Sequence, residues 1–506
     1  MLAFIFSQLA GLLRRILVAR AFGTFIELDA FIAANRVSET LFNLIAGGAL
    51  GSAFIPTFTS LLVRGDKRSA WKLASAVANI IFVTLSSLGI IAFFFAPQIV
   101  RYGPAPGLAN DPQLNQLTVN LLRIQLISAV LFGLSGLVMG ILNSHQVFLI
   151  PALAPAMYQL GMIFGVLVLS PHLGIYGLAW GVVIGSSFHL LLQIPSLIIR
   201  KGKYSFDLGI GDSAVGEVIR LMIPRLFGVA VVQLNFWVNS WLATQMSPGS
   251  LVGIDFGFSL MLMAQAVIAQ SIATAMMPTL TSQYALGKLN DLRISLTATL
   301  RSVLFLAVPA SAGLILLRKP IIALLYQRGN FDAHSTDLVA WALLWYGVGL
   351  VGHSLLEILA RAFYAMHDTK TPVLVGVGAM SLNVVLSFVF ASFFARVGWM
   401  PHGGLALANS LATTLEAVIL LILIGIRLKG VNFKSLLTGF FQASAASMLM
   451  GFAIYLWLQQ MINYPTWMNA LGGFLIGGVV YFISAWLIRI PEIRNLPSYF
   501  INRFFR

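Results

Sequence analysis

The sequence contains no cysteine, and this absence excludes several kinds of chemistry. A chain of 506 residues without a thiol has no disulfide framework, no thiolate metal ligand and no cysteine nucleophile. Charged residues are scarce as well: they make up 9% of the chain and hydrophobic residues 59%, whereas a soluble domain has roughly 25% charged residues. Because so apolar a chain cannot cover its surface with polar side chains, water is excluded as its main solvent.

Long apolar runs dominate what is present. A helix needs about 20 apolar residues to cross a bilayer. Runs of this length predict an all-α polytopic membrane protein with about fourteen transmembrane helices. The longest polar stretches, 99–115 and 200–213, are too short for a soluble domain. The predicted spans are 2–22, 28–63, 71–98, 116–143, 148–170, 174–199, 214–246, 251–283, 294–317, 334–366, 371–396, 403–427, 435–461 and 466–489.

The basic residues predict how these spans are oriented. The chain has 31 Lys and Arg against 16 Asp and Glu, a net charge of +15. Loops and tail on the side of the two termini hold 18 of the basic residues, and the opposite loops hold 5. The positive-inside rule therefore predicts both termini in the cytoplasm. Since no basic, aromatic-bearing module stands outside the membrane, we expect no nucleic-acid partner.

An internal repeat divides the chain. Pro, two Thr and Ser recur at the same spacing in 54–60 and 276–282, at the end of a span in both places. Two further matches follow in the same order. They predict two parallel six-helix repeats, at 1–200 and 214–427, then two extra helices at 435–489 and a basic cytoplasmic tail at 490–506. This plan is typical of secondary transporters, although a duplication kept for packing alone would leave the same pattern.

Charged residues inside spans mark the candidate site, because they are costly there and normally face a cavity or a partner. The second span places Asp29, Arg36 and Asn43 on one helical face, with Glu39 at its edge. Two interpretations remain open: a polar lining of a water-filled cavity, or an internal ion pair between Arg36 and Glu39. The first span adds Arg14 and Arg15, whose guanidinium groups suit phosphate.

The second half of the chain supplies candidates for ion or proton coupling. His353 lies one turn before Glu357, a spacing that suits a proton relay, although a membrane histidine also serves packing. Asn239 and Asn383 could offer oxygens to a small cation, or bridge helices without any ion. The sequence has no Gly-rich phosphate loop, no HExxH motif and no recognisable nucleophile triad, so we predict no catalytic residue, metal site or cofactor.

Several motifs together resemble a known family, the MurJ (MviN) lipid II flippases of the multidrug/oligosaccharidyl-lipid/polysaccharide exporter superfamily. The resemblance covers nearly the whole chain. The motifs are SQLAGLLRR at 7–15, ARAFG at 19–23, DAF at 29–31, GGALGSAFIP at 47–56, GILN at 140–143, IPALAP at 150–155, LYQRGNF at 325–331 and AFYAMHDTKTP at 362–372.

The resemblance implies a V-shaped transporter of two six-helix bundles in the bacterial cytoplasmic membrane. Its implied substrate is an undecaprenyl-pyrophosphate-linked peptidoglycan precursor, lipid II, with the lipid tail in a groove formed by the two final spans. It also implies coupling to Na⁺ or to the membrane potential, and a partner complex of cell-wall synthesis. The chain is then a transporter and not an enzyme.

Some of the residues that line the cavity in this family have counterparts in this sequence, and others do not. Arg14, Asp29 and Arg36 match charged positions of the family pattern, and Arg15 stands where an acidic residue is common. Asn383 fits the sodium-site pattern, whereas Ser387 replaces a usual acid or amide. Three positions where the family usually has arginine differ in this chain, namely Gln8, Asn43 and Ser259.

Because these three arginines are replaced, two alternative functions remain open in addition to that of a lipid II flippase. One is a flippase for another polyprenyl-linked glycan, or a drug exporter, on the same fold. The other is a membrane scaffold that kept the fold and does not transport.

Overall fold

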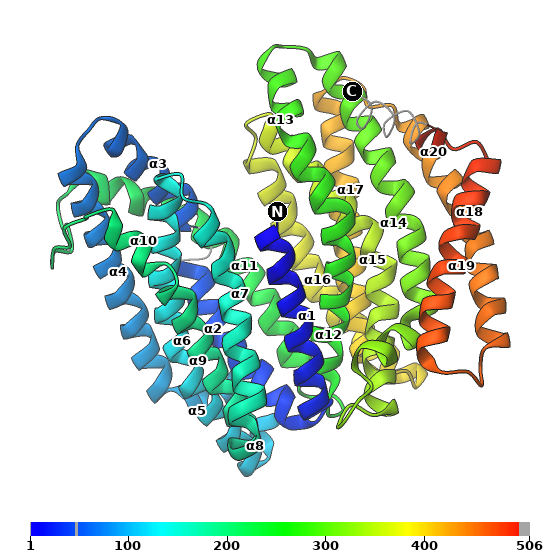
Figure 1. Ribbon diagram of the computed structural model, residues 1–506, viewed down its shortest axis with the longest axis horizontal. Helices are drawn as coiled ribbons and strands as arrows, with labels where there is room; N and C mark the ends of the chain where they lie inside the picture. Colours follow the sequence, from blue (N-terminus) through cyan, green and yellow to red (C-terminus); the bar gives the residue numbers. More distant parts are fainter. Residues whose placement is uncertain (1, 46–48, 495–506) are drawn as a thin grey trace. The chain divides into compact units, whose positions relative to one another are not determined.

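The computed structural model describes residues 2–45 and 49–494, and Figure 1 shows them as a set of long helices. No strand occurs in these residues, which confirms the predicted all-α class. The described parts of the predicted spans are almost entirely helical. Eleven helical segments among the described residues are long and apolar enough to cross a membrane. The multi-pass character is thus confirmed, while the count of fourteen spans stays a prediction.

The chain packs into two compact units, and each is described by itself. Unit 1 consists of Met1–Leu251 together with the short segment Arg328–Phe331. Its helices are α1 (Leu2–Phe22), α2 (Ile26–Ile45), α3 (Ala49–Val63), α4 (Lys67–Phe94), α5 (Ala96–Tyr102), α6 (Pro112–Ser144), α7 (Leu149–Phe164), α8 (Ser170–Leu173), α9 (Ile175–Leu191), α10 (Ile194–Ile199) and α11 (Ser213–Ala243). A π-helical turn, Gly165–Leu169, joins α7 to α8.

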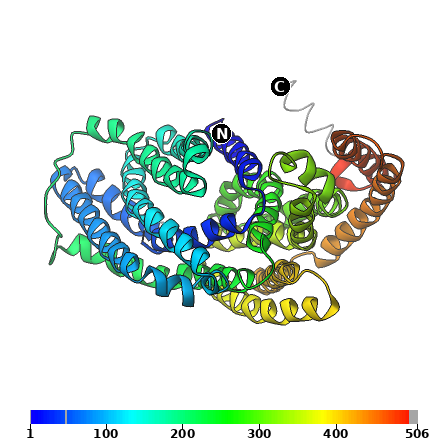
Figure 2. The same cartoon turned by 90° about the horizontal axis from the view of Figure 1, so that it is seen from below.

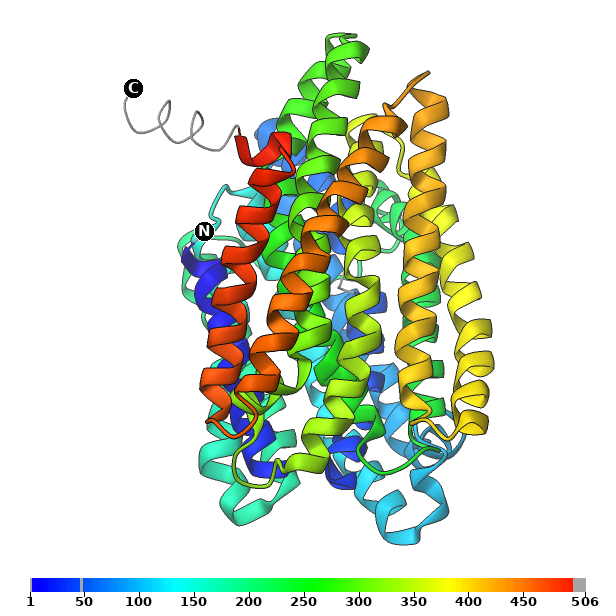
Figure 3. The ribbon, with the colours of Figure 1, turned by 90° about the vertical axis from the view of Figure 1, so that its right-hand side faces the viewer.

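Unit 2 consists of Val252–Gln327 and Asp332–Arg506. Its helices are α12 (Ser250–Gln265), α13 (Ser271–Ala285), α14 (Leu289–Tyr326), α15 (Ala333–Ala365), α16 (Lys370–Val397), α17 (His402–Arg427), α18 (Phe433–Gln460), α19 (Thr466–Leu487) and α20 (Pro491–Arg494). A π-helical turn, Ala266–Gln270, separates α12 from α13. Helices α18 and α19 run side by side along α14 at the edge of this unit (Figures 2 and 3).

The division by packing falls at residue 251, so α11 belongs to unit 1. The predicted repeats at 1–200 and 214–427 were defined by similarity between two parts of the sequence. The packing units do not test that similarity, so the repeats stay a prediction. The predicted second span, 28–63, corresponds to α2 and α3, and residues 46–48 between them lie outside the described part. Of the predicted tail at 490–506, residues 495–506 also lie outside it.

The segment Arg328–Phe331 completes the end of α1. The backbone N–H of Asn330 donates to the carbonyl oxygen of Arg20 over 3.0 Å, and its side-chain amide donates to that of Ala21 over 2.7 Å. These are carbonyls of the last helical turn, which have no partner within the helix itself. Gly23 follows with φ +56°, and a β-carbon there would overlap the carbonyl oxygen of Asn330. The LYQRGNF motif therefore includes a cap for α1.

Helices α7 and α9 approach each other through glycines. A β-carbon on Gly161 would overlap the Cα of Gly185, and one on Gly165 would lie 2.6 Å from the Cα of Gly181. Each helix thus carries a Gly-x-x-x-Gly pair, the spacing that lets membrane helices pack backbone against backbone. This contact fixes the wall of unit 1 in which Tyr158 and His189 stand.

Candidate functional site

A cavity of about 490 Å³ lies inside unit 1, between α2, α3, α6, α7 and α9. Phe42, Ile55, Phe132 and Met139 supply apolar parts of its wall. Its polar lining comes from four of these helices, α2, α6, α7 and α9. The side chains that bear nitrogen or carboxylate groups there are Asn35, Glu39, Asn43, Asn143, Gln159 and His189.

The polar stripe of α2 contains the ion pair that one interpretation predicted. An Nη1 of Arg36 lies 3.1 Å from Oε2 of Glu39, and Nδ2 of Asn35 donates to Oε1 of Glu39 over 2.7 Å. The Arg36 guanidinium also lies over the ring of Phe236, 5.1 Å from its centroid. Glu39 and Asn43 nevertheless line the cavity. The two interpretations are therefore compatible, because one carboxylate takes part in both arrangements.

Asp29, at the start of the stripe, is buried, with 2% of its surface exposed. Its Oδ2 accepts a hydrogen bond of 2.6 Å from the backbone N–H of Gly249. As an acidic residue in the first turn of α2, it also interacts favourably with the positive end of the helix dipole. This geometry gives Asp29 a role in holding the loop after α11 against α2.

The two arginines of α1 are half-buried. An Nη1 of Arg14 lies 3.0 Å from the sulfur of Met162 on α7, which places this guanidinium against the glycine-bearing helix. Gln8, two turns earlier, is exposed. A role of Arg14 and Arg15 in binding substrate stays a prediction.

In unit 2 the predicted coupling residues have separate partners. Nε2 of His353 lies 3.1 Å from Oδ1 of Asn409, whereas Glu357 accepts a hydrogen bond of 2.7 Å from Arg361. Arg361 also donates to the hydroxyl of Thr274 over 2.6 Å. His353 and Glu357 are thus each hydrogen-bonded to a different residue, and their use as a proton relay stays a prediction.

The remaining candidates make short-range contacts. Ser387 donates to Oδ1 of Asn383 over 3.2 Å, and both residues are fully buried. Asn239 donates to Oδ1 of Asn235 over 3.3 Å, one turn away on α11. Ser259 donates to the carbonyl oxygen of Asp255 over 2.7 Å. A small cation at Asn239 or Asn383 stays a prediction.

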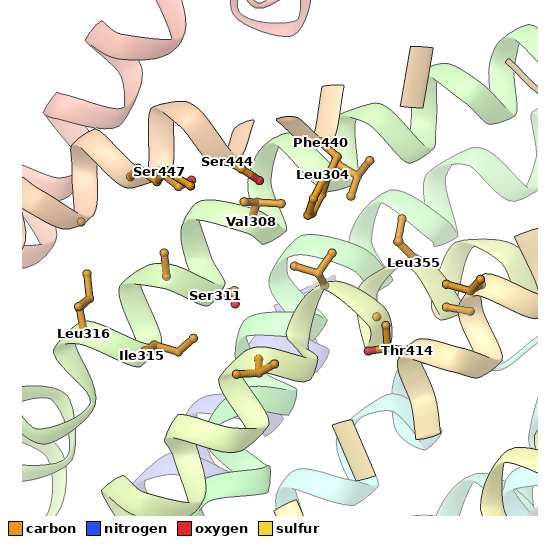
Figure 4. Close-up of a pocket in the computed structure, with 18 of the residues that line it drawn as sticks. Leu304, Val308, Ser311, Ile315, Leu316, Leu355, Thr414, Phe440, Ser444 and Ser447 are labelled. Carbon is orange, nitrogen blue, oxygen red and sulfur yellow. The ribbon is translucent and has the colours of Figure 1, made fainter. Parts of the chain in front are cut away.

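Unit 2 has a cavity of its own, of about 750 Å³, between α14, α15, α17 and α18. Figure 4 shows leucine, isoleucine, valine and phenylalanine side chains around it. Two of its hydroxyls are already used within the protein: Ser311 donates to the carbonyl of Gly347, and Thr414 to that of Ser410. Ser444 and Ser447 add two further hydroxyls, and the rest of the wall is mostly hydrocarbon, suited to an apolar chain.

Sequence reasoning did not find His189, whose side chain lines the cavity of unit 1. Its Nδ1 lies 2.6 Å from the hydroxyl of Ser135 on α6, and Gln193 donates to that hydroxyl over 2.7 Å. All three residues are buried. One sequence signal was present, since His189 and Gln193 are four residues apart in an otherwise apolar run.

The eleven long apolar helical segments of the described residues define the class of protein, a multi-pass membrane protein. A solved structure described as the inward-facing conformation of a multidrug resistance MATE family transporter of the MOP superfamily matches with a TM-score of 0.70. It covers 84% of this chain and 94% of that chain at 15% identity, a likeness that shows the fold.

Within that class, the chain belongs to the MurJ family. The family model described as lipid II flippase MurJ matches residues 18–474. A lipid II flippase MurJ of Burkholderia cenocepacia is 31% identical over 84% of this chain and 82% of that protein. A probable lipid II flippase MurJ of Vibrio cholerae is 30% identical over 97% and 95%. A solved structure titled lipid II flippase MurJ, inward closed conformation, covers 100% and 99% with a TM-score of 0.81 and 26% identity.

Proposed function

We propose that this chain moves lipid II across the bacterial cytoplasmic membrane by alternating access. The family match over residues 18–474 is the observation that carries this proposal. The 31% identical relative named as a lipid II flippase supports it. The likeness to drug exporters is one of fold, at 15% identity, so it does not favour the drug-exporter alternative. The function is transport and not catalysis.

The arginines of α1 and α2 are the proposed contacts for the pyrophosphate. A guanidinium group binds two phosphate oxygens at once, and Arg14, Arg15 and Arg36 keep this chemistry where Gln8, Asn43 and Ser259 do not. The guanidinium of Arg36 forms an ion pair with Glu39 within the protein. We therefore assign the larger part of headgroup binding to Arg14 and Arg15.

The apolar cavity of unit 2 is the proposed place for the polyprenyl tail. Helix α18, one of the two helices that follow the predicted repeats, forms one wall with Phe440 and Met448. The neighbouring helix α14 forms another part of the wall, with Leu304, Val308 and Ile315. A polyprenyl chain has no hydrogen-bonding groups, so a wall that is mostly hydrocarbon suits it.

Orientation, coupling and partners complete the proposal. The excess of basic residues on the terminal side supports a cytoplasmic position for both termini. Transport is coupled to Na⁺ or to the membrane potential, with Asn239, Asn383, His353 and Glu357 as the residues to test. A complex of cell-wall synthesis is the proposed protein partner.

Lipid II translocation in reconstituted vesicles tests this function. Arg14→Ala should insert normally, because removal of a charge from a span eases insertion, but should abolish transport. Arg14→Lys keeps the charge without the fork of donors and should restore transport only in part. Since Arg15 could substitute for its neighbour, the Arg14→Ala/Arg15→Ala variant is the decisive one. Wild-type transport by that variant would contradict the cationic mechanism, and a wild-type chain that moves no lipid II would contradict the proposed function itself.

A further inference from the structure

We propose that the cavity of unit 1 binds a sugar ring of the lipid-linked glycan, with the imidazole of His189 as a hydrogen-bond donor to it. This inference rests on the proposed function and assigns a second part of the substrate to a second part of the protein. The cavity, at about 490 Å³, falls within the range of roughly 300–1,000 Å³ typical of small-molecule sites. It is formed by unit 1 alone.

The buried triad of Gln193, Ser135 and His189 determines which imidazole nitrogen carries the proton. The side-chain nitrogen of Gln193 lies 2.9 Å from the carbonyl oxygen of His189, which can only accept, so this atom is the amide nitrogen. It also donates to the hydroxyl of Ser135 over 2.7 Å. The Ser135 proton is then directed to Nδ1 of His189, 2.6 Å away. A neutral imidazole whose Nδ1 accepts has its proton on Nε2.

The Nε2–H group is therefore available for a ligand. No hydrogen bond joins Nε2 of His189 to another residue in the described part of the chain, although the residue is 7% exposed and lines the cavity. The ring is held in place by more than the triad, since Phe132 contacts it edge to face at 5.4 Å between centroids. A buried donor that is fixed in orientation and lacks a partner is what a ligand oxygen would satisfy.

The neighbouring helices α6 and α7 add acceptors and an aromatic face to the lining. Oε1 of Gln159 is buried without a hydrogen-bond partner among the described residues. Asn143 adds a second amide to the lining, and Tyr158 an aromatic ring next to Phe132, with 5.0 Å between the ring centroids. Neutral donors and acceptors beside aromatic rings match a sugar, which has hydroxyls on its edge and C–H groups on its faces.

The charges in the cavity favour a neutral ligand over a cation. Glu39 is the carboxylate of the lining, and both of its oxygens have donors: Arg36 at 3.1 Å and the amide of Asn35 at 2.7 Å. A cation would have to displace the Arg36 guanidinium. The side chain of Glu39 is also 44% exposed, so its carboxylate keeps contact with solvent.

Binding to the purified full-length chain in lipid nanodiscs tests the inference. Two probes are compared, undecaprenyl pyrophosphate and lipid II whose peptide has been removed, so that the two share the anchor and differ only in the sugars. The wild-type chain should bind the sugar-bearing probe more tightly. In His189→Leu and in Gln159→Leu, affinity for the sugar-bearing probe should fall by about tenfold or more, because each leaves sugar groups unpaired, while affinity for undecaprenyl pyrophosphate should stay the same.

The matched control is Asn120→Leu, the same kind of change on α6. Asn120 contacts Gln116 and Tyr176 and does not line the cavity. Its affinity for both probes should equal that of the wild type. If His189→Leu fails to fold, Gln159→Leu and Asn143→Leu decide the question, because both residues are only partly buried.

Each outcome has one meaning. A loss confined to the sugar-bearing probe supports the inference. If the variants lose affinity equally for both probes, or for neither, the inference is overturned. It is also overturned if these residues bind Na⁺ or an apolar drug more tightly than the glycan. If the wild-type chain transports lipid II but binds both probes equally, the inference fails and the proposed function stands. If it transports no lipid II, the proposed function fails.

Discussion

Gly161 on α7 lies so close to Gly185 on α9 that a β-carbon on Gly161 would overlap the Cα of Gly185. Tyr158 and Gln159 precede this contact on α7, and His189 follows it on α9 by one turn. The spacing between the two helices is thus fixed by residues that have no side chain, immediately beside the polar part of the unit 1 cavity.

Gly161→Ala should therefore lower stability. A methyl group at this position meets backbone atoms that cannot rotate away, and overpacking of this kind costs typically about 1–3 kcal/mol. Gly89→Ala on α4 is the matched control, because no atom lies within 4 Å of the added carbon. Alanine is the better helix former, so the control should unfold at the same temperature or higher. Thermal unfolding in detergent compares the two; equal melting temperatures would contradict the close packing.

The helices could be predicted from the sequence because span length is a local property of an apolar run. The ion pair of Arg36 with Glu39 was predictable for the same reason, since i,i+3 spacing places both on one helix. The contact of Ser135 with His189 joins residues 54 apart, and an apolar span gives little sign of which face meets which neighbour. The cavity of unit 1 depends on such contacts, so its lining could be predicted only along α2.

The π-helical turns at Gly165–Leu169 and Ala266–Gln270 were not predicted, because composition alone does not show them. A π-turn reaches one residue further per hydrogen bond and shifts the faces of the helix beyond it.

Ser135→Ala should destabilise unit 1 by more than the loss of one hydroxyl group would suggest. The change removes one hydroxyl but leaves both Nδ1 of His189 and one N–H of Gln193 without a partner in a buried place. An unsatisfied buried polar group costs about 1–3 kcal/mol. Ser187→Ala on α9 is a suitable control, because that hydroxyl bonds only the carbonyl of Val183 within its own helix. Equal unfolding temperatures for both variants would contradict the triad.

Asp332 should make the stability of α15 depend on pH. The backbone N–H of Ser335 donates to its carboxylate over 2.8 Å, and this bond lowers the pKa of Asp332 below its ordinary value. A carboxyl with a lowered pKa in the folded state contributes stability above the unfolded pKa of about 3.9, and loses it as the pH falls through the folded value.

Three forms of residue 332 separate the charge from the cap. Asp332→Ala should cost about 1 kcal/mol at pH 7, because the helix loses its N-cap. Asp332→Asn keeps a capping oxygen, so it should unfold close to the wild type at pH 7 and lose less stability than the wild type between pH 5 and pH 3. The measurement is the melting temperature across this range. An asparagine variant with the same acid sensitivity as the wild type would show that Asp332 does not contribute to it.

The proposed orientation can be tested directly because the chain has no cysteine. Lys67→Cys is at the first residue of α4, on the predicted side of the termini, and leaves the cap of α4 by Asp66 intact. Asn110→Cys lies in the loop before α6, on the opposite side. Both positions are exposed. An impermeant thiol reagent added to intact cells should label Asn110→Cys and not Lys67→Cys; the reverse pattern would place the termini outside.

The Arg36–Glu39 pair separates a structural role from a functional one. An ion pair removed as a pair often costs little stability, because neither charge is left without a partner. Arg36→Leu/Glu39→Leu should therefore insert and remain folded. Its lipid II transport should nevertheless be lost, since Glu39 lines the unit 1 cavity and Arg36 holds it there. The control is Lys319→Leu/Asp337→Leu, which removes an exposed pair with 2.6 Å between Nζ and Oδ1 and should transport at the wild-type rate. Transport in vesicles and the melting temperature are measured for both variants. If the Arg36/Glu39 double variant is folded and transports as fast as the control, the pair serves packing alone, and the polar face of α2 has no part in moving the substrate.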